Sequence, residues 1–192
     1  MLNRPNHSMS QSFSALLNSI REGGYILYAR HAEATVGSDL PNLNFYDCAT
    51  QRNLSDRGRS QAVTYGEEIR RLNIPIMYPV ITSPFCRNIE TAQLAFGEQS
   101  FQIEPFLIDI YRLSRPLNPW EQVRILNQLH SVLETQPSPG RNTVIIGHSF
   151  PRGVGLGRIP NMGTVIVKPF GQRNGYQIAA QLSLGRLTSF GV

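Results

Sequence analysis

The chain has 192 residues, and its 18 lysines and arginines exceed its 13 acidic residues to give a net charge of +5. This length suits one domain with a sizeable core, so we expect a single domain over residues 1–192, with residues 1–10 disordered. The basic residues are dispersed and no aromatic-basic motif accompanies them, which argues against a nucleic-acid partner. No apolar run approaches the ~20 residues that span a bilayer, and the N-terminus lacks a signal-like apolar segment. We therefore expect a cytoplasmic protein without a membrane partner.

The pattern of apolar residues predicts strands that alternate with helices. Residues 13–20 have the apolar spacing of an amphipathic helix, and a buried strand is expected over 25–29. A polar loop over 32–53 is long enough to indicate a functional segment. The remaining predicted elements are a helix with Ser55 as N-cap and an apolar face to Leu72, a strand at 80–83, a helix at 84–96, a strand at 101–103, a loop at 104–119, a helix at 120–133, and strands at 143–147, 165–167 and 177–180. Alternation of this kind favours an α/β fold with a largely parallel sheet.

Polar side chains follow three of the predicted strands. They are Arg30 and His31 after the first strand, Ser83 and Arg87 after the second, and His148 after the third. The carboxyl ends of parallel strands share one edge of a sheet, where ligands bind. An arginine in the first turn of a helix suits an anion, because helix N-termini have free N–H groups and the guanidinium fork matches phosphate oxygens. The alternative is that the histidines are structural and that Arg87 pairs with an acidic residue on the protein surface.

The ordered set of motifs resembles the histidine phosphatase superfamily, which has the phosphoglycerate-mutase-like fold. The matching motifs are Arg30-His31, Ser83-Pro84 with Arg87 and Thr91-Ala92, Gly147-His148, and the helix start from Leu54 to Ala62. The resemblance covers residues 25 to about 180. It implies a three-layer α/β/α sandwich with a mostly parallel central sheet.

The resemblance also implies roles for single residues. His31 would be the nucleophile that takes the phosphoryl group as phosphohistidine, and it must be neutral to attack. Arg30 and Arg87 would grip the phosphoryl oxygens, and His148 would contact the same oxygens. Phosphoryl transfer depends mostly on positioning and electrostatics, so we expect neither a metal nor another cofactor.

The proton donor is harder to assign. One branch of the family has an aspartate directly after the second histidine, where this chain has Ser149. The other branch uses an acid in a Leu-x-Glu context, which Leu107-Ile108-Asp109 matches with aspartate in place of glutamate. We therefore expect Asp109 to be the donor, with Glu104 and Glu33 as competitors. Asp109 could instead be a loop residue that pairs with a nearby arginine.

Further residues of the loop and its surroundings are weaker candidates. Arg52 is the best additional substrate ligand, because its loop follows the nucleophile, and Glu33 is a second candidate. Two cysteines, Cys48 and Cys86, are too few for a disulfide framework. We expect them to be free thiols, although they could pair if they lie close together.

The departures from the family pattern favour hydrolysis over phosphoryl transfer between substrates. Mutases of this family usually have an asparagine where this chain has Gly37, and they are longer. We therefore expect a phosphatase that hydrolyses a phosphate monoester of a small molecule, as a monomer or homodimer. The alternatives are a protein phosphohistidine phosphatase, a phosphoglycerate-type mutase and an inactive anion-binding module.

Overall fold

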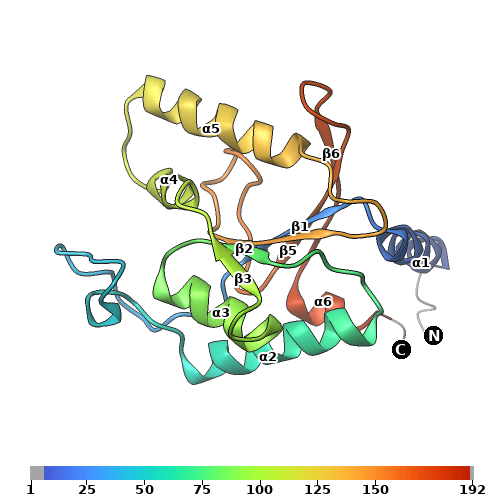
Figure 1. The fold of residues 1–192 in the computed structure, drawn as a ribbon, viewed down its shortest axis with the longest axis horizontal. Helices are drawn as coiled ribbons and strands as arrows, with labels where there is room; N and C mark the ends of the chain where they lie inside the picture. Colours follow the sequence, from blue (N-terminus) through green and yellow to red (C-terminus); the bar gives the residue numbers. More distant parts are fainter. Residues whose placement is uncertain (1–6, 191–192) are drawn as a thin grey trace, which may run out of the picture.

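One six-stranded sheet forms the centre of the protein, for which a computed structural model describes residues 7–190 (Figure 1). The strand order is β3-β2-β4-β1-β5-β6, in which β3, β2, β4 and β1 run parallel and β5 and β6 are antiparallel additions. The strands are β1 (Ile26–Arg30), β2 (Val80–Thr82), β3 (Phe101–Ile103), β4 (Thr143–Gly147), β5 (Thr164–Pro169) and β6 (Tyr176–Leu182). The predicted α/β fold with a mostly parallel sheet is confirmed.

Helices cover both faces of this sheet and complete a three-layer α/β/α sandwich (Figure 1). One face carries α2 (Asp56–Arg71), α3 (Cys86–Phe96) and the short α6 (Leu184–Thr188), and the other carries α4 (Leu107–Arg112) and α5 (Pro119–Glu134). Helix α1 (His7–Glu22) packs against the same core as α2 and α6.

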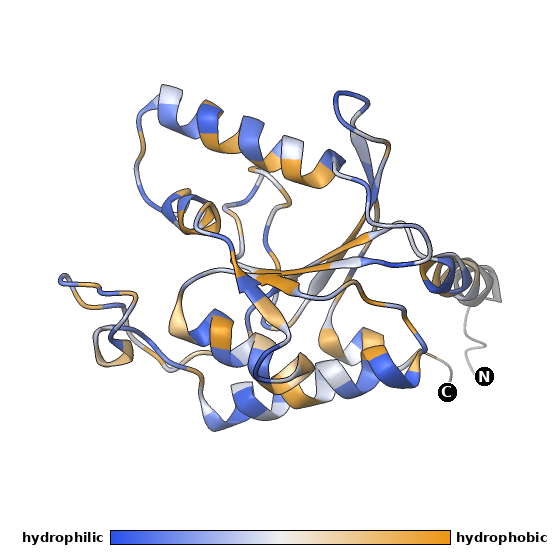
Figure 2. Ribbon diagram, viewed as in Figure 1, coloured by the Kyte–Doolittle hydropathy of each residue, from blue (hydrophilic) through white to orange (hydrophobic). Residues whose placement is uncertain are grey.

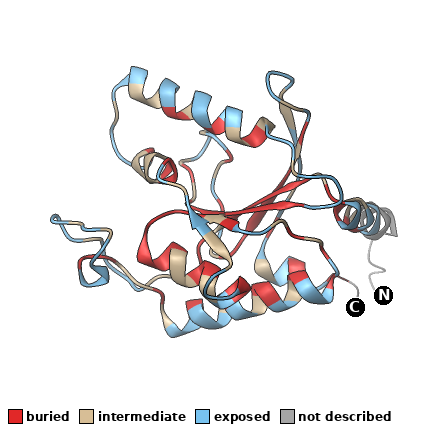
Figure 3. Cartoon of the chain, in the orientation of Figure 1, coloured by how far each residue is buried: buried red, intermediate tan, exposed pale blue. Residues whose placement is uncertain are grey.

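The alternation of side chains along β1 explains why the sheet has two cores. Leu27 and Ala29 belong to the core beneath α2 and α3, whereas Ile26 and Tyr28 belong to the core beneath α4 and α5. Successive side chains of a strand point to opposite faces, so a strand that is buried on both sides is apolar throughout. Figures 2 and 3 show the result, with hydrophobic, buried strands at the centre and polar, exposed residues on the outer faces of the helices.

Several element boundaries differ from the predictions. Helix α1 begins at residue 7, so residues 7–10 of the segment expected to be disordered are helical, and residues 1–6 lie outside the described part. The segment 104–119, predicted as a loop, contains α4, whose Leu107 and Ile110 are buried. Helix α6 was not predicted. No helix within residues 7–190 has the length and apolar character needed to cross a membrane.

Candidate active site

Two histidines meet at the carboxyl edge of the sheet because β1 and β4 are neighbours in parallel register. Arg30 pairs with Gly147 in that register, so the next residue of each strand, His31 and His148, lies at the same level. The ring centroids of the two histidines are 5.6 Å apart, and both residues are buried. Ser83, which follows β2, places its Oγ 2.9 Å from His148 Nε2. The convergence of three strand ends predicted from the sequence is present in the structure.

The hydrogen bonds of His31 determine its tautomer. Nδ1 lies 2.7 Å from the carbonyl oxygen of Ala32, and because a carbonyl oxygen can only accept, Nδ1 carries the proton. Nε2 then retains its lone pair. Burial, together with the positive charges of Arg87 and Arg30, holds the pKa of His31 well below its usual range. His31 is therefore neutral near pH 7, with one nucleophilic nitrogen.

Helix α3 is fixed to the same edge by side chains from its first turns. Asn88 donates from Nδ2 to the carbonyl oxygens of the last two residues of β4, at 3.1 and 2.9 Å. Thr91 Oγ1 accepts a hydrogen bond from the Ala32 N–H at 3.2 Å and donates to Arg87 O at 2.6 Å. These contacts hold the N-terminus of α3, and with it Arg87, beside the nucleophile candidate.

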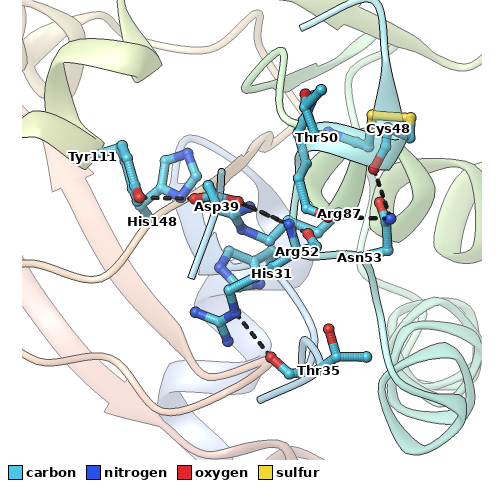
Figure 4. A network of polar contacts seen from close by, with 12 residues as sticks. His31, Thr35, Asp39, Cys48, Thr50, Arg52, Asn53, Arg87, Tyr111 and His148 are labelled. Atoms are coloured by element: carbon cyan, nitrogen blue, oxygen red, sulfur yellow. Dashed lines mark hydrogen bonds and ion pairs between the residues drawn. A yellow bond between two sulfur atoms is a disulfide. The ribbon is translucent and has the colours of Figure 1, made fainter. Parts of the chain in front are cut away.

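Arg87 is buried and makes an ion pair that is not predictable from the sequence pattern. Its guanidinium contacts the carboxylate of Asp39 from the long loop, and the Tyr111 hydroxyl donates to the same carboxylate at 2.7 Å (Figure 4). The guanidinium also lies over the ring of Phe85, 4.3 Å from its centroid, in cation–π geometry. Asp39 and Tyr111 are therefore site residues that sequence reasoning missed. Asp39 lies in a polar loop without periodic pattern, and Tyr111 lies in α4, where the sequence predicts a loop.

Two further arginines bring positive charge to the site. Arg30 donates from Nη1 to Ile159 O at 3.1 Å, and burial and the charges of Arg52 and Arg87 lower the pKa of Arg30. Arg52 donates from Nε to Thr35 O at 2.8 Å, which holds its guanidinium near His31 (Figure 4). The structure thus brings together Arg30, Arg87 and Arg52 as the sequence predicted, although their roles toward a substrate stay predictions.

The acidic residues expected as proton donors are engaged elsewhere. Asp109 forms ion pairs with Arg112 at 3.0 Å and Arg124 at 2.9 Å, and none of its contacts in the described part of the chain involves the two histidines or Arg87. Glu33 accepts from the Ser55 hydroxyl at 3.0 Å and so helps to fix the start of α2. Glu104 accepts from the backbone of Phe106. These contacts give no support to the donor role that the resemblance implies for Asp109.

We expect Asp109→Asn to lower kcat by less than about threefold, whereas loss of a general acid typically costs 10²-fold or more. The reason is that Arg112 and Arg124 engage the Asp109 carboxylate, which in the described part of the chain makes no contact with the two histidines or with Arg87. The measurement is turnover of p-nitrophenyl phosphate and of an alkyl phosphate with a poor leaving group. A large loss confined to the alkyl phosphate would show instead that Asp109 is the donor.

The expectation of free thiols is wrong, because Cys48 and Cys86 form a disulfide with a Cα–Cα distance of 5.8 Å. Cys48 begins the short helix η1 (Cys48–Thr50) in the long loop, and Cys86 begins α3 directly before Arg87. Gln51 reinforces the link, because its Oε1 accepts from the Cys86 N–H at 2.9 Å. The loop that carries Asp39 and Arg52 is therefore tied covalently to the helix that carries Arg87.

A cavity of about 660 Å³ adjoins Arg30. Its other lining residues come from the turn after α4 and from the segment after β4, and include Ser114, Ser149, Phe150 and Arg158. Ser149 Oγ, at the position where one branch of the family has an aspartate, accepts from the Ile159 N–H at 2.9 Å. Within residues 7–190, no three His, Cys, Asp or Glu side chains are grouped as a metal site would require.

Comparison with known proteins agrees with this architecture. The sequence model of the histidine phosphatase superfamily (branch 1) matches residues 26–111, the segment that contains β1, α2, β2, α3 and most of α4. This match agrees with the family resemblance that the motifs indicate. No curated protein matches the sequence of the chain.

Solved structures show the same fold at low sequence identity. The protein histidine phosphatase SixA complexed with tungstate is 14% identical with a TM-score of 0.55, over 85% of this chain and 99% of that one. The product of the open reading frame Rv3214 from Mycobacterium tuberculosis is 20% identical with a TM-score of 0.55, over 82% and 96%. A mutant phosphoserine phosphatase from Entamoeba histolytica in complex with phosphoserine is 15% identical with a TM-score of 0.53, over 85% and 98%.

Proposed function

We propose that the protein is a phosphatase that hydrolyses a phosphate monoester through a phosphohistidine at His31. The observation that carries the proposal is the state of His31, whose Nδ1 proton is committed to Ala32 O while Nε2 keeps its lone pair, near the positive charges of Arg87 and Arg30. A buried neutral imidazole beside concentrated positive charge suits attack on an anionic phosphorus centre. The match of residues 26–111 to the model of the histidine phosphatase superfamily supports the same chemistry.

The reaction has two steps. In the first, Nε2 of His31 attacks phosphorus, the bond from phosphorus to the ester oxygen breaks, and the departing alkoxide takes a proton from a carboxylic acid or from solvent and leaves as the alcohol. In the second, water attacks the phosphoryl group, the phosphorus–nitrogen bond breaks, and inorganic phosphate leaves with the neutral imidazole restored. The chain's own positive charge, from Arg30 and Arg87, meets the charge on the phosphoryl oxygens in both steps, so the proposal needs no metal ion.

The cavity beside Arg30 favours a small phosphorylated molecule as substrate. Its volume of about 660 Å³ lies within the usual range for small-molecule sites. Two of its lining residues, Ser149 and Phe150, follow His148 directly, so a leaving group in the cavity would lie next to the phosphoryl site. This observation favours a small substrate over a phosphoprotein. Because a small phosphate monoester and a phosphoprotein differ greatly in size, comparing the turnover of the two substrates tests this preference directly.

Trapping of the covalent intermediate tests the proposal. Protein mixed with radiolabelled phosphate monoester and quenched in alkali should retain label that acid releases, because phosphohistidine is stable to base and labile to acid. Mass spectrometry should place the label on the peptide that contains His31. The trapping is repeated at low temperature, where turnover is slow. If the protein hydrolyses the ester but no label is trapped at either temperature, or if the label is on another residue, the proposed nucleophile is contradicted.

The lowered pKa of His31 predicts activity that persists in mild acid. The nucleophile is active when neutral, and a folded-state pKa well below 6.5 keeps it neutral as the pH falls through 6. We expect kcat/KM to show no loss from His31 protonation near pH 6.5, with that loss displaced to clearly lower pH. NMR titration of the ring protons in the free protein separates this effect from ionisation of the substrate, whose second phosphate pKa is near ~6. A His31 midpoint at 6.5 or above would contradict the expectation.

A further inference from the structure

The carboxylate of Asp39 binds the guanidinium group of Arg87 in the proposed phosphoryl site (Figure 4). Its Oδ1 accepts from Arg87 Nη1 at 2.8 Å and from the Arg52 backbone N–H at 2.9 Å. Its Oδ2 accepts from the Tyr111 hydroxyl at 2.7 Å and from Arg87 Nη2 at 3.3 Å. The side chains of Asp39 and Arg87 are each only 2% exposed. A phosphoryl oxygen that bound this fork would need the donors that Asp39 now occupies.

The site nevertheless has donors that a carboxylate does not satisfy. Nε of Arg87 and Nε of Arg30 are buried, and neither has an acceptor in the described part of the chain. Buried donors without partners are costly, and a carboxylate has two oxygens where a phosphoryl group has three and more charge. A phosphoryl group that displaced Asp39 could therefore satisfy more of the site than Asp39 does.

The segment around Asp39 can move without opening a core. No residue of the loop 33–53, all of which the structure describes, belongs to either hydrophobic core. Val36 is fully exposed and Leu40 is half exposed. The covalent anchor of the loop is at Cys48, nine residues further along the chain, so the disulfide does not hold Asp39 itself in place.

We propose that Asp39 is an internal anionic ligand of the phosphoryl site, which it closes in the free protein and leaves when a phosphoryl group binds. The inference rests on the proposed function, because it takes Arg87 as a ligand of the substrate. The apparent affinity for phosphate is then the intrinsic affinity multiplied by the fraction of molecules in which Asp39 has left. Asp39 thus sets the threshold concentration of phosphorylated ligand at which the site fills.

Calorimetric titration with inorganic phosphate tests this role. In Asp39→Asn the amide can still accept from Arg87 but lacks the negative charge, and we expect phosphate to bind at least about tenfold more tightly than to wild type. Asp47→Asn is the matched control, because Asp47 lies in the same loop and caps η1 by accepting from the Ala49 N–H, a role that asparagine can also fill. Its phosphate affinity should equal that of wild type. Equal or weaker binding by folded Asp39→Asn would overturn the proposal.

A second measurement needs no variant. The Arg52 amide donates to Asp39, whereas the Ala49 amide donates to Asp47, so the two amides report on separate aspartates of one loop. Phosphate added to wild type should shift the Arg52 amide resonance and leave that of Ala49 in place. An Arg52 resonance that does not move at saturating phosphate would also overturn the proposal. Both measurements use binding alone, so a failure to trap phosphohistidine would count against the phosphatase and not against the displacement of Asp39.

Discussion

His31→Ala should lower kcat for p-nitrophenyl phosphate by a factor on the order of 10⁴ or more, a size typical for loss of a covalent nucleophile. The structure explains why the neighbouring histidine cannot readily replace it. His148 is the nearest second imidazole, with its ring centroid 5.6 Å away, but its Nε2 is engaged with the Ser83 hydroxyl. Burial, together with His31, Arg87 and Arg30, holds the pKa of His148 well below its usual range. His148 is therefore neutral, but its Nε2 stays engaged with Ser83.

The measurement is initial turnover from pH 4 to 8, since the residual rate of the variant must stay low at every pH. His130→Ala is the matched control, because His130 is exposed on α5 and contacts Tyr176, which lies beside the amino end of β1, at the edge of the sheet opposite the two histidines. The control should retain wild-type turnover. If folded His31→Ala releases phosphate as fast as wild type, the protein is an anion-binding module or uses another nucleophile.

The residues at the strand ends could be predicted because their positions follow from local patterns. Apolar runs over 25–29 and 143–147 identify buried strands, and parallel pairing then brings His31 and His148 together whatever the details of the loops. The start of α2 could also be predicted from the sequence, because Ser55 is a favourable N-cap residue. In the structure its Oγ accepts a hydrogen bond from the Gly58 N–H at 3.0 Å. These features depend on residues within a few positions of one another.

The remaining site residues depend on contacts between distant segments. Asp39 meets Arg87 across 48 positions and Tyr111 across 72, and no local pattern in a polar loop selects one aspartate as the partner of a buried arginine. Pro105 and Pro116, on either side of α4, favour a loop prediction for this segment. The buried residues Leu107 and Ile110 nevertheless have helical spacing. Two cysteines likewise carry no information on whether the fold brings them into contact.

Removal of the disulfide should destabilise the protein by about 4 kcal/mol, the value that loop-closure entropy assigns to a separation of 38 residues. The variant Cys48→Ser/Cys86→Ala removes the bond, with alanine at the buried position to avoid an unpaired hydroxyl. Disulfides persist mainly in oxidising compartments, so this bond also weighs against the cytoplasmic location expected from the N-terminal sequence.

Urea unfolding measures the loss of stability, and chemical reduction of the disulfide in wild type provides the control. Wild type treated with a phosphine reductant should unfold at the same urea concentration as the double variant, whereas the variant should not respond to the reductant. Because the bond joins the Asp39 loop to the start of α3, the loss of stability should be accompanied by faster amide exchange at Gln51 and Cys86, which share a hydrogen bond. A difference in unfolding free energy below about 1 kcal/mol would contradict the contribution expected from loop-closure entropy.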